Sequence, residues 1–186
     1  MTYDWLELNK QAHAEFGRRV SAIRDWNAPT PDSEWNVRDL VRHVVIEQQW
    51  VLPLLKGLTL AEAEATIAPL CDDLAGEWRR YSWLATDAWQ SIPADAPIHL
   101  SYGMVTAAGY LREVVSDVTI HSWDLARAVA TDEALDDHLV EAVWTVFEPQ
   151  KDMLATSGLY AASVPAGKNV PLQSRLLALT GRDDRR

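Results

Sequence analysis

The chain has 186 residues, 48% of them hydrophobic, which suits one globular domain with a sizeable core. Its 17 Lys and Arg against 27 Asp and Glu give a formal net charge of −10. Such a surface repels phosphate backbones and anionic lipids, so nucleic acid is not expected as a partner. The single cysteine, Cys71, excludes an internal disulfide and a thiolate-rich zinc site.

The N-terminal residues lack the basic and apolar regions of a signal peptide. No run approaches the roughly 18 consecutive apolar residues that a transmembrane helix needs. We therefore expect a cytoplasmic protein with no membrane partner. The acidic composition suits a monomer or a homodimer.

Apolar residues recur at three- and four-residue steps over residues 2–26, which predicts a first helix with one buried stripe. The Pro-rich stretch 27–33 predicts a loop. A second helix is expected to begin after Asn36, a suitable N-cap. Pro53 should end or kink this helix, and Gly57 follows it.

A capping box predicts a short helix over residues 59–64, and a third long helix follows over about 70–92. Residues 93–103 are the least helical and suit a loop or a short extended segment. A fourth long helix is predicted over about 106–129.

A fifth helix is predicted over about 136–156 and a short one over 172–179, and the tail 181–186 is expected to fray. No linker divides the chain. Four long amphipathic helices with modest connections predict a single helix-bundle domain over residues 1–186.

Two polar side chains interrupt the apolar face of the fourth helix. Asp117 and His121 are four residues apart, which places them about 40° apart around the helix axis, one turn from each other. On the second helix, His43 lies beside the stripe that faces the core. Two imidazoles and a carboxylate from facing helices form a set of three metal ligands with open positions, typical of catalytic sites.

The spacing alone leaves a simpler interpretation open. A histidine near an apolar stripe is often a core residue bonded to a backbone carbonyl. An Asp and a His four residues apart often form only a local hydrogen bond or ion pair. A metal-free structural bundle therefore remains an alternative.

Three segments, 35–45, 121–128 and 175–183, resemble the DinB-like superfamily. The resemblance is to the small actinobacterial-type branch related to the N-terminal domain of mycothiol-dependent maleylpyruvate isomerase. The combination W-x-x-x-D-L-x-x-H with D-x-x-x-H-x-W-D-L-A-R carries it. It implies an all-α, DinB-like up-and-down four-helix bundle with additional short helices.

The resemblance also implies one divalent metal ion held by His43, Asp117 and His121. Zinc is the favoured ion, with nickel and iron as alternatives. The isomerase has Glu where this chain has Asp117, so a shorter carboxylate arm must reach the metal.

The function implied is activation of a low-molecular-weight thiol such as mycothiol, or of water, against a small electrophilic substrate. The protein would then be a thiol S-transferase or an isomerase, with its chemistry at the metal and no catalytic side chain assigned. The isomerase has a further C-terminal domain that helps to complete its active site, so isomerisation of maleylpyruvate itself is not implied. A non-catalytic metal-binding or partner-binding module is the alternative.

Two carboxylates are candidates for contacts behind the ligands. Glu47 would be a fourth ligand or an acceptor for His43, although a solvated role suits it equally. Asp124 would orient His121 or pair with Arg127, and we favour the ion pair.

The remaining candidates receive simpler interpretations. Trp123 is expected in the core or in a pocket wall. Cys71 is predicted to begin a helix as a small buried hydrophobic residue. His13, His99 and His138 are expected at the surface, with His99 in the irregular segment.

Overall fold

The computed structural model describes residues 3–32, 34–158, 160–167 and 169–185. It divides into two compact units, residues 1–133 and 134–186, and each is described by itself. The single domain expected over residues 1–186 stays a prediction, because a division by contacts does not test whether the two units fold together.

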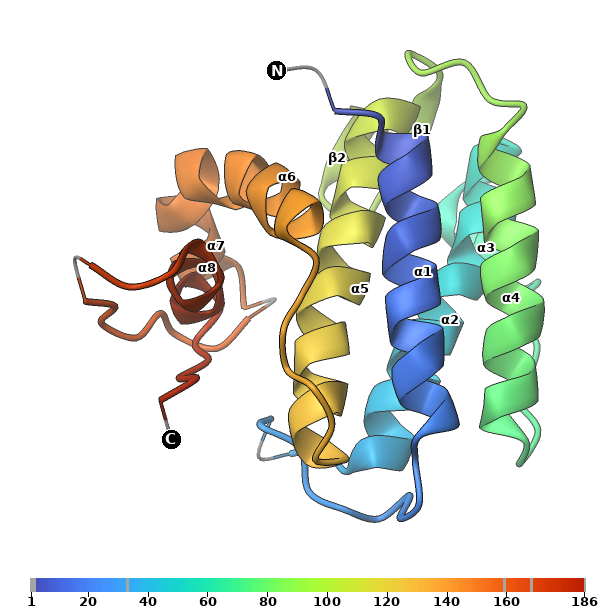
Figure 1. Ribbon diagram of the computed structural model, residues 1–186. Coiled ribbons are helices and arrows are strands. Elements are labelled where there is room, and N and C mark those ends of the chain that lie inside the picture. Colours follow the sequence, from blue (N-terminus) through green and yellow to red (C-terminus); the bar gives the residue numbers. More distant parts are fainter. Residues whose placement is uncertain (1–2, 33, 159, 168, 186) are drawn as a thin grey trace. The chain divides into compact units, whose positions relative to one another are not determined.

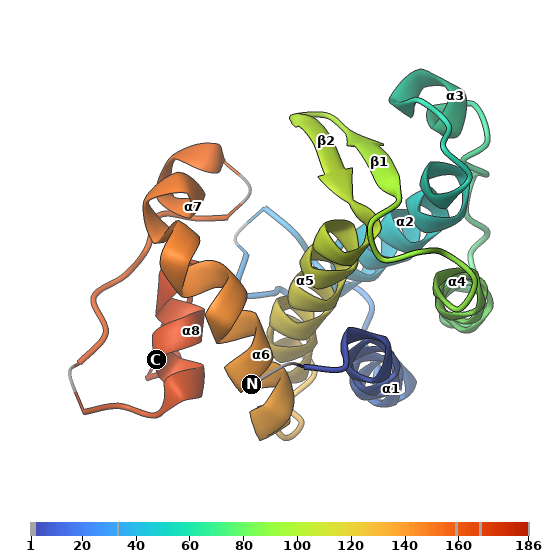
Figure 2. The same ribbon diagram turned by 90° about the horizontal axis from the view of Figure 1, so that it is seen from above.

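The first unit is a bundle of four long helices (Figure 1), and its described residues are mostly helical, as predicted. The long helices are α1 (Trp5–Ser21), α2 (Val37–Leu55), α4 (Leu74–Trp89) and α5 (Ala107–Ala128). Seen along the bundle in Figure 2, α1 packs against α4 and α5, and α2 packs against the same two helices. The core therefore lies between two pairs of helices.

Helices α1 and α5 run in one direction, and α2 and α4 run in the other (Figure 1). Side-chain contacts agree, since His13 on α1 meets Thr86 late in α4, whereas Phe16 meets Trp78 early in it. The chain reaches the start of α4 through residues 56–73, which include the short helix α3 (Leu60–Glu64). Its predicted capping box is present, with Thr59 and Glu62 bonded reciprocally.

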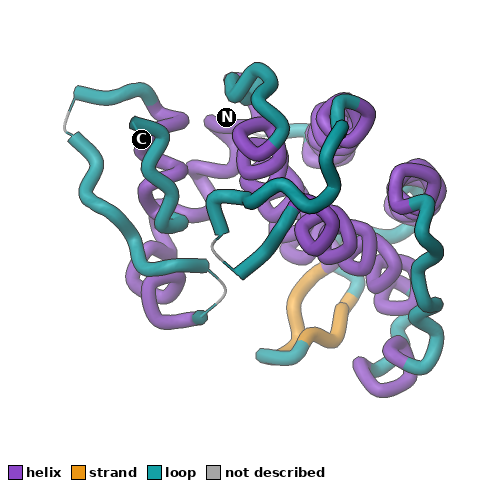
Figure 3. Tube along the Cα trace, turned by 90° about the horizontal axis from the view of Figure 1, so that it is seen from below, coloured by secondary structure: helices purple, strands orange, loops and turns teal. Residues whose placement is uncertain are grey.

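A β-hairpin connects α4 to α5, and it is orange in Figure 3. Strands β1 (Pro97–Leu100) and β2 (Gly103–Thr106) pair antiparallel, with Leu100 opposite Gly103. Gly103 has a φ of 143°, which favours glycine at this tight turn. The extended alternative for residues 93–103 is the correct one.

Two helix ends differ from the prediction. Helix α1 ends at Ser21 rather than near 26, with Ala22 as its C-cap. In the turn that follows, the Asp25 side chain accepts a hydrogen bond from the backbone of Asn27. Helix α4 begins at Leu74, after the N-cap Asp73. Cys71 therefore precedes the helix, and it is exposed rather than buried. Both predictions for Cys71 were wrong.

Pro53 lies inside α2 and does not end it at once. The helix continues to Leu55, and Gly57 follows in the left-handed region with a φ of 80°. The proline thus lies in the last turn, where little of the helix remains for a missing N–H to disrupt.

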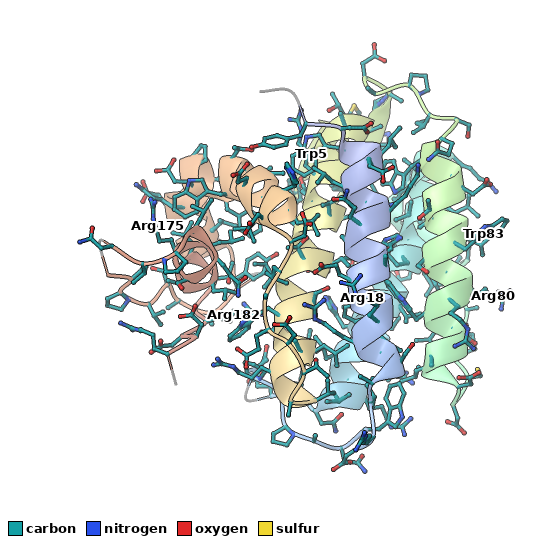
Figure 4. All side chains as sticks on the ribbon, viewed as in Figure 1. Trp5, Arg18, Arg80, Trp83, Arg175 and Arg182 are labelled. Carbon is teal, nitrogen blue, oxygen red and sulfur yellow. The ribbon has the colours of Figure 1, made fainter. Side chains whose placement is uncertain are left out.

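The second unit contains α6 (Asp137–Phe147), a 3₁₀ turn (Glu148–Gln150), α7 (Lys151–Ser157) and α8 (Leu172–Leu179). Pro149 lies in the 3₁₀ turn and divides the single helix predicted over 136–156. Helix α8 has the predicted bounds. Arg175, labelled in Figure 4, stacks 4.4 Å from the ring centroid of Trp144.

The tail was expected to fray, but its described residues, 181–185, are bonded to α8. The backbone N–H of Arg182 donates to Leu177, and the Ser174 hydroxyl donates to Asp184 at 2.5 Å. These bonds hold residues 181–185 against α8. Among the described residues, no helix is long and apolar enough to cross a membrane.

Candidate metal centre

The structure brings the three predicted ligands together between α2 and α5. His43 comes from α2, and Asp117 and His121 come from α5; one ligand atom of each lies within 4.8 Å of the others. Asp117 lies between the imidazoles, with Oδ1 3.4 Å from Nε2 of His121 and Oδ2 3.8 Å from Nε2 of His43. Separations of this size between the carboxylate oxygens and the imidazole nitrogens suit a cation shared by all three side chains.

Local sequence sets the position of both helices. Asn36 begins α2 with a full capping box, in which its side chain accepts from the Asp39 backbone and Asp39 accepts in return. Thr106 caps α5 by accepting from the backbone of Gly109. Since α2 and α5 run antiparallel as neighbours, His43 faces the middle of α5.

The donors present fit a divalent metal ion. Oδ2 of Asp117 is buried, and it accepts no hydrogen bond from any described residue. An unpaired buried carboxylate oxygen is costly, and a cation would satisfy it. Two imidazole nitrogens and a carboxylate oxygen are ligands that zinc accepts with open positions remaining.

The cluster favours positive charge. Burial alone lowers the pKa of His121, but the Asp117 and Asp124 carboxylates outweigh it and raise that pKa to about 9. Burial would raise the pKa of Asp117, but the nearby charges of His121 and His43 hold it well below its usual range. The same field that holds a proton on His121 attracts a metal cation.

Asp124 lies behind His121 and fixes its orientation. Its Oδ2 is 3.0 Å from Nδ1 of His121, and the Asp124 side chain is only 1% exposed. A carboxylate bonded to one ring nitrogen leaves the other, Nε2, directed at the cluster. Arg127 donates to both carboxylate oxygens of Glu133, and the ion pair with Asp124 that the sequence favours stays a prediction.

Glu47 lies near the cluster without joining it. Burial and the charge of Asp117 raise the pKa of Glu47, and the charges of His43 and His121 lower it less. Among the described residues, the set of converging ligand atoms contains His43, Asp117 and His121 but not Glu47. Glu47 lies one helical turn after His43 on α2 and adds a second carboxylate near the metal cluster.

The β-hairpin carries further polar groups toward this region. The Tyr102 hydroxyl donates to Glu113, four residues before Asp117 on α5. The pKa of buried Tyr110 is raised by burial and then by the charges of Glu47, Glu113 and Asp117. Tyr102, Tyr110 and Glu113 thus add hydroxyl and carboxylate groups close to the cluster.

Trp35 is a site residue that the spacing argument missed. Its ring centroid lies 4.8 Å from that of His43 and 5.8 Å from that of His121. It comes from the loop before α2, so no helical periodicity indicates it. The available signal was its place as the first residue of the W-x-x-x-D-L-x-x-H motif.

The other singled-out residues lie elsewhere. Trp123 is buried, as expected, and His99 and His138 are exposed, as expected. His13 was wrongly expected at the surface: it is 8% exposed and packs edge-on against Trp78, 5.3 Å away. Its imidazole Nδ1 lies 3.0 Å from the Thr86 hydroxyl.

A bundle of α1, α2, α4 and α5 with a His-Asp-His cluster between two of its helices defines a DinB-like helical protein. The family model of the mycothiol maleylpyruvate isomerase N-terminal domain matches residues 10–126. The chain therefore belongs to that family. The match includes all of α2 and α4, most of α1 and α5, and every residue of the cluster.

Individual proteins are also similar to this chain. Two uncharacterized proteins of Mycobacterium tuberculosis, from strains CDC 1551 and H37Rv, are each 25% identical over 96% of this chain and 98% of their own length. A mutant of mycothiol-dependent maleylpyruvate isomerase, solved by crystallography, is 18% identical with a TM-score of 0.60. That likeness covers 75% of this chain and 66% of the isomerase chain, and it shows the shared fold.

Proposed function

We propose that His43, Asp117 and His121 bind one divalent metal ion, with zinc favoured over nickel and iron. The observation that carries the proposal is the convergence of their ligand atoms within 4.8 Å, around a buried Asp117 oxygen with no hydrogen bond from the described residues. The shorter arm of Asp117 suffices, since its two oxygens already lie toward the two imidazoles.

We further propose that the protein is an enzyme that activates a low-molecular-weight thiol of the mycothiol type against a small electrophile. A thiol S-transferase or an isomerase fits this chemistry. When bound, a divalent ion supplies a Lewis acid that lowers the pKa of a thiol or of water. Membership in a family described by a mycothiol-dependent isomerase supports the thiol over water.

The chain's own residues would prepare the site. Asp124 orients His121, and Trp35 packs over both imidazoles and limits the approach of water from that side. His43 and Asp117 keep 30% and 24% of their side chains exposed, whereas His121 keeps 6%. A substrate would therefore approach from the side of His43 and Asp117.

The second candidate is a metal-binding module without turnover. It predicts the same metal stoichiometry and the same ligands, but no thiol chemistry. The exposed side of the cluster favours the enzyme, because a purely structural metal site is normally closed by a fourth protein ligand.

Elemental analysis of protein made without a polyhistidine tag tests the metal site. We expect about one metal ion per chain, lost in His43→Ala, Asp117→Asn and His121→Ala. The matched control is His99→Ala, which removes an exposed histidine from the hairpin and should keep the metal. Equal metal content in all four variants would contradict the proposal.

Thiol consumption then separates the enzyme from the module. Mycothiol and chlorodinitrobenzene are incubated with the metal-loaded protein, and conjugate formation is compared with that of metal-free protein and of His43→Ala. We expect conjugation only in the loaded wild type. A loaded protein that accelerates neither this reaction nor those of other common thiols favours the module.

A further inference from the structure

Glu47 is a carboxylate beside the metal cluster whose role the ligand set does not explain. It follows His43 by four residues, which places the two side chains about 40° apart on one face of α2. It is half-buried, and it forms no hydrogen bond or ion pair with the described residues. The charge of Asp117 acts on it more strongly than the charges of the two histidines do. An unpaired carboxylate in this position would meet a ligand of the metal.

Helix α5 adds a second carboxylate in the matching position. Glu113 precedes Asp117 by four residues, so it lies on the same face of α5. Because α2 and α5 run in opposite directions, Glu47 and Glu113 both lie on the side of the cluster that is nearer to the β-hairpin (Figure 1). Glu113 is exposed, and it accepts a hydrogen bond from the hydroxyl of Tyr102 at the hairpin turn. Two helices thus place acidic groups along one edge of the cluster.

Tyr110 supplies a hydrogen-bond donor at the same edge. Its side chain is only 6% exposed, and its hydroxyl forms no hydrogen bond with the described residues. Burial raises the pKa of this hydroxyl, and the charges of Glu47, Glu113 and Asp117 raise it further. The phenol therefore keeps its proton, and the edge of the cluster combines carboxylate acceptors with one unpaired donor.

The arginines of these two helices are directed elsewhere. Arg42 lies about 140° around α2 from Glu47, and Arg112 lies about 140° around α5 from Asp117. The Arg112 guanidinium stacks over the ring of Trp5, 5.8 Å from its centroid. Among the described residues, the charges that shift the pKa of Glu47 come from one aspartate and two histidines, and none comes from a Lys or an Arg. An anionic group bound at this edge would therefore meet repulsion without a basic side chain to offset it.

We propose that Glu47 selects the thiol by charge, so that a thiol with a cationic or uncharged head group binds and one with an anionic head group is repelled. The proposal rests on the proposed function, since the sulfur would bind the metal held by His43, Asp117 and His121. The head group would then lie beside Glu47 and Glu113, where carboxylates attract a cation or accept a hydrogen bond from a hydroxyl or an amide. Selection of this kind acts mainly by rejecting the wrong ligand.

Titration calorimetry of the zinc-loaded protein tests the proposal with three thiols that share a two-carbon chain. Thiocholine carries a permanent positive charge, 2-mercaptoethanol is uncharged, and 2-mercaptoethanesulfonate is negative. The trimethylammonium group has no lone pair for zinc, and a sulfonate is a poor ligand. Comparing each thiol between protein variants removes differences in the acidity of the thiols themselves.

We expect wild type to bind thiocholine most tightly and 2-mercaptoethanesulfonate least tightly. In Glu47→Gln, thiocholine should bind roughly two- to tenfold more weakly and the sulfonate more tightly by a similar factor. Binding of 2-mercaptoethanol should change little. Glu47→Asp keeps the charge and should keep the order of the three thiols. Glu64→Gln, at an exposed glutamate that ends α3, is the matched control and should behave as wild type does.

The metal content of each variant is measured first, and Glu47→Gln should keep its metal. If Glu47→Gln does not fold, wild type in rising salt gives a second measurement. Salt screens the carboxylates, so the difference in affinity between thiocholine and 2-mercaptoethanesulfonate should narrow. A difference that salt leaves unchanged would contradict selection by charge.

The outcomes separate this proposal from the proposed function. Wild type that binds no metal would overturn the proposed function and the charge selection with it. Metal-loaded wild type that binds none of the thiols would overturn the thiol chemistry and the selection together. Metal-loaded wild type that binds all three equally, or a Glu47→Gln variant that changes all three alike, would overturn the charge selection alone.

Discussion

At the scale of single residues, the charges around His121 indicate more clearly than the three ligands alone that the cluster suits a metal cation. Asp117 in front of the ring and Asp124 behind it both stabilise a positive centre, and Asp124 is nearly inaccessible to solvent. A buried carboxylate is retained at such a cost only where a partner needs it. That arrangement makes Asp124 the best test of whether the cluster is built for a metal.

Asp124→Asn should weaken metal binding by about 10- to 100-fold while the three ligands remain in place. The amide keeps the shape of the side chain but no longer supports the His121 ring with a negative charge. Competition with a chromophoric chelator measures the metal dissociation constant. Asp95→Asn, at an exposed loop carboxylate, is the control, and equal affinity in both variants would show Asp124 to be merely structural.

The pH dependence of stability should reveal His13. Burial lowers the pKa of His13 from 6.5 to about 4, outweighing its contacts with Gln48 and Ser82, which raise it. Between pH 6.5 and 4 the unfolded chain therefore binds more protons than the folded one, so stability falls as pH falls through this window. The loss amounts to about 3 kcal/mol at most.

Urea unfolding of metal-free wild type and His13→Gln across this pH range measures the effect. The wild type should lose more stability than the variant, since glutamine does not titrate, and His138→Gln should follow the wild type. Parallel profiles for wild type and His13→Gln would show that His13 is protonated equally in both states.

The sequence could predict only part of the site. The pairing of Asp117 with His121 follows from helical spacing, because both residues lie on one helix. The third ligand, His43, does not follow from spacing, because no local sequence feature indicates which face of α2 contacts α5. The family motif, and not periodicity, joins His43 to the pair. Trp35 reaches the two imidazoles through tertiary contacts that helical periodicity does not indicate.

At the scale of helices and strands, end signals were more reliable than periodicity. Helix α5 begins and ends within one residue of the prediction, because Thr106 provides an unambiguous cap. The apolar repeat of α1 continues through Ile23 and Trp26, although the helix has ended. Those two side chains are half-buried in the loop after α1, and their spacing there happens to continue the three- and four-residue repeat of the helix. Strands of four residues are too short to show a period.

The capping box of α2 should contribute measurably to stability. Asn36→Ala removes the acceptor for the Asp39 N–H and should lower the free energy of unfolding by about 1 kcal/mol. Thr59→Ala makes the equivalent change at α3, which has only five residues and buries little. We expect a smaller loss there. Chemical denaturation compares the two, and equal losses would contradict a special role for the α2 cap.

At the scale of the whole molecule, metal binding should couple to folding. The three ligands come from two helices, so the unfolded chain does not hold them together. Zinc at about 100 times its dissociation constant should therefore stabilise the fold by about 2.7 kcal/mol. Thermal unfolding with and without zinc measures this. His43→Ala should show no shift, and a shift of equal size in that variant would place the zinc elsewhere.

Scanning calorimetry of the full chain tests the prediction of one domain over residues 1–186. A single cooperative transition is expected if both units fold together. The calorimetric and van't Hoff enthalpies should then agree. Two resolved transitions would show that residues 1–133 and 134–186 unfold independently.

His43 and Asp117 lie 74 positions apart in the chain, yet their side chains meet between α2 and α5. An ion held by both would link the two ends of a loop that contains α3, α4 and the β-hairpin. Such a link restricts a long stretch of chain, as a disulfide does. The proposed metal would thus serve as a cross-link in a protein whose single cysteine excludes an internal disulfide.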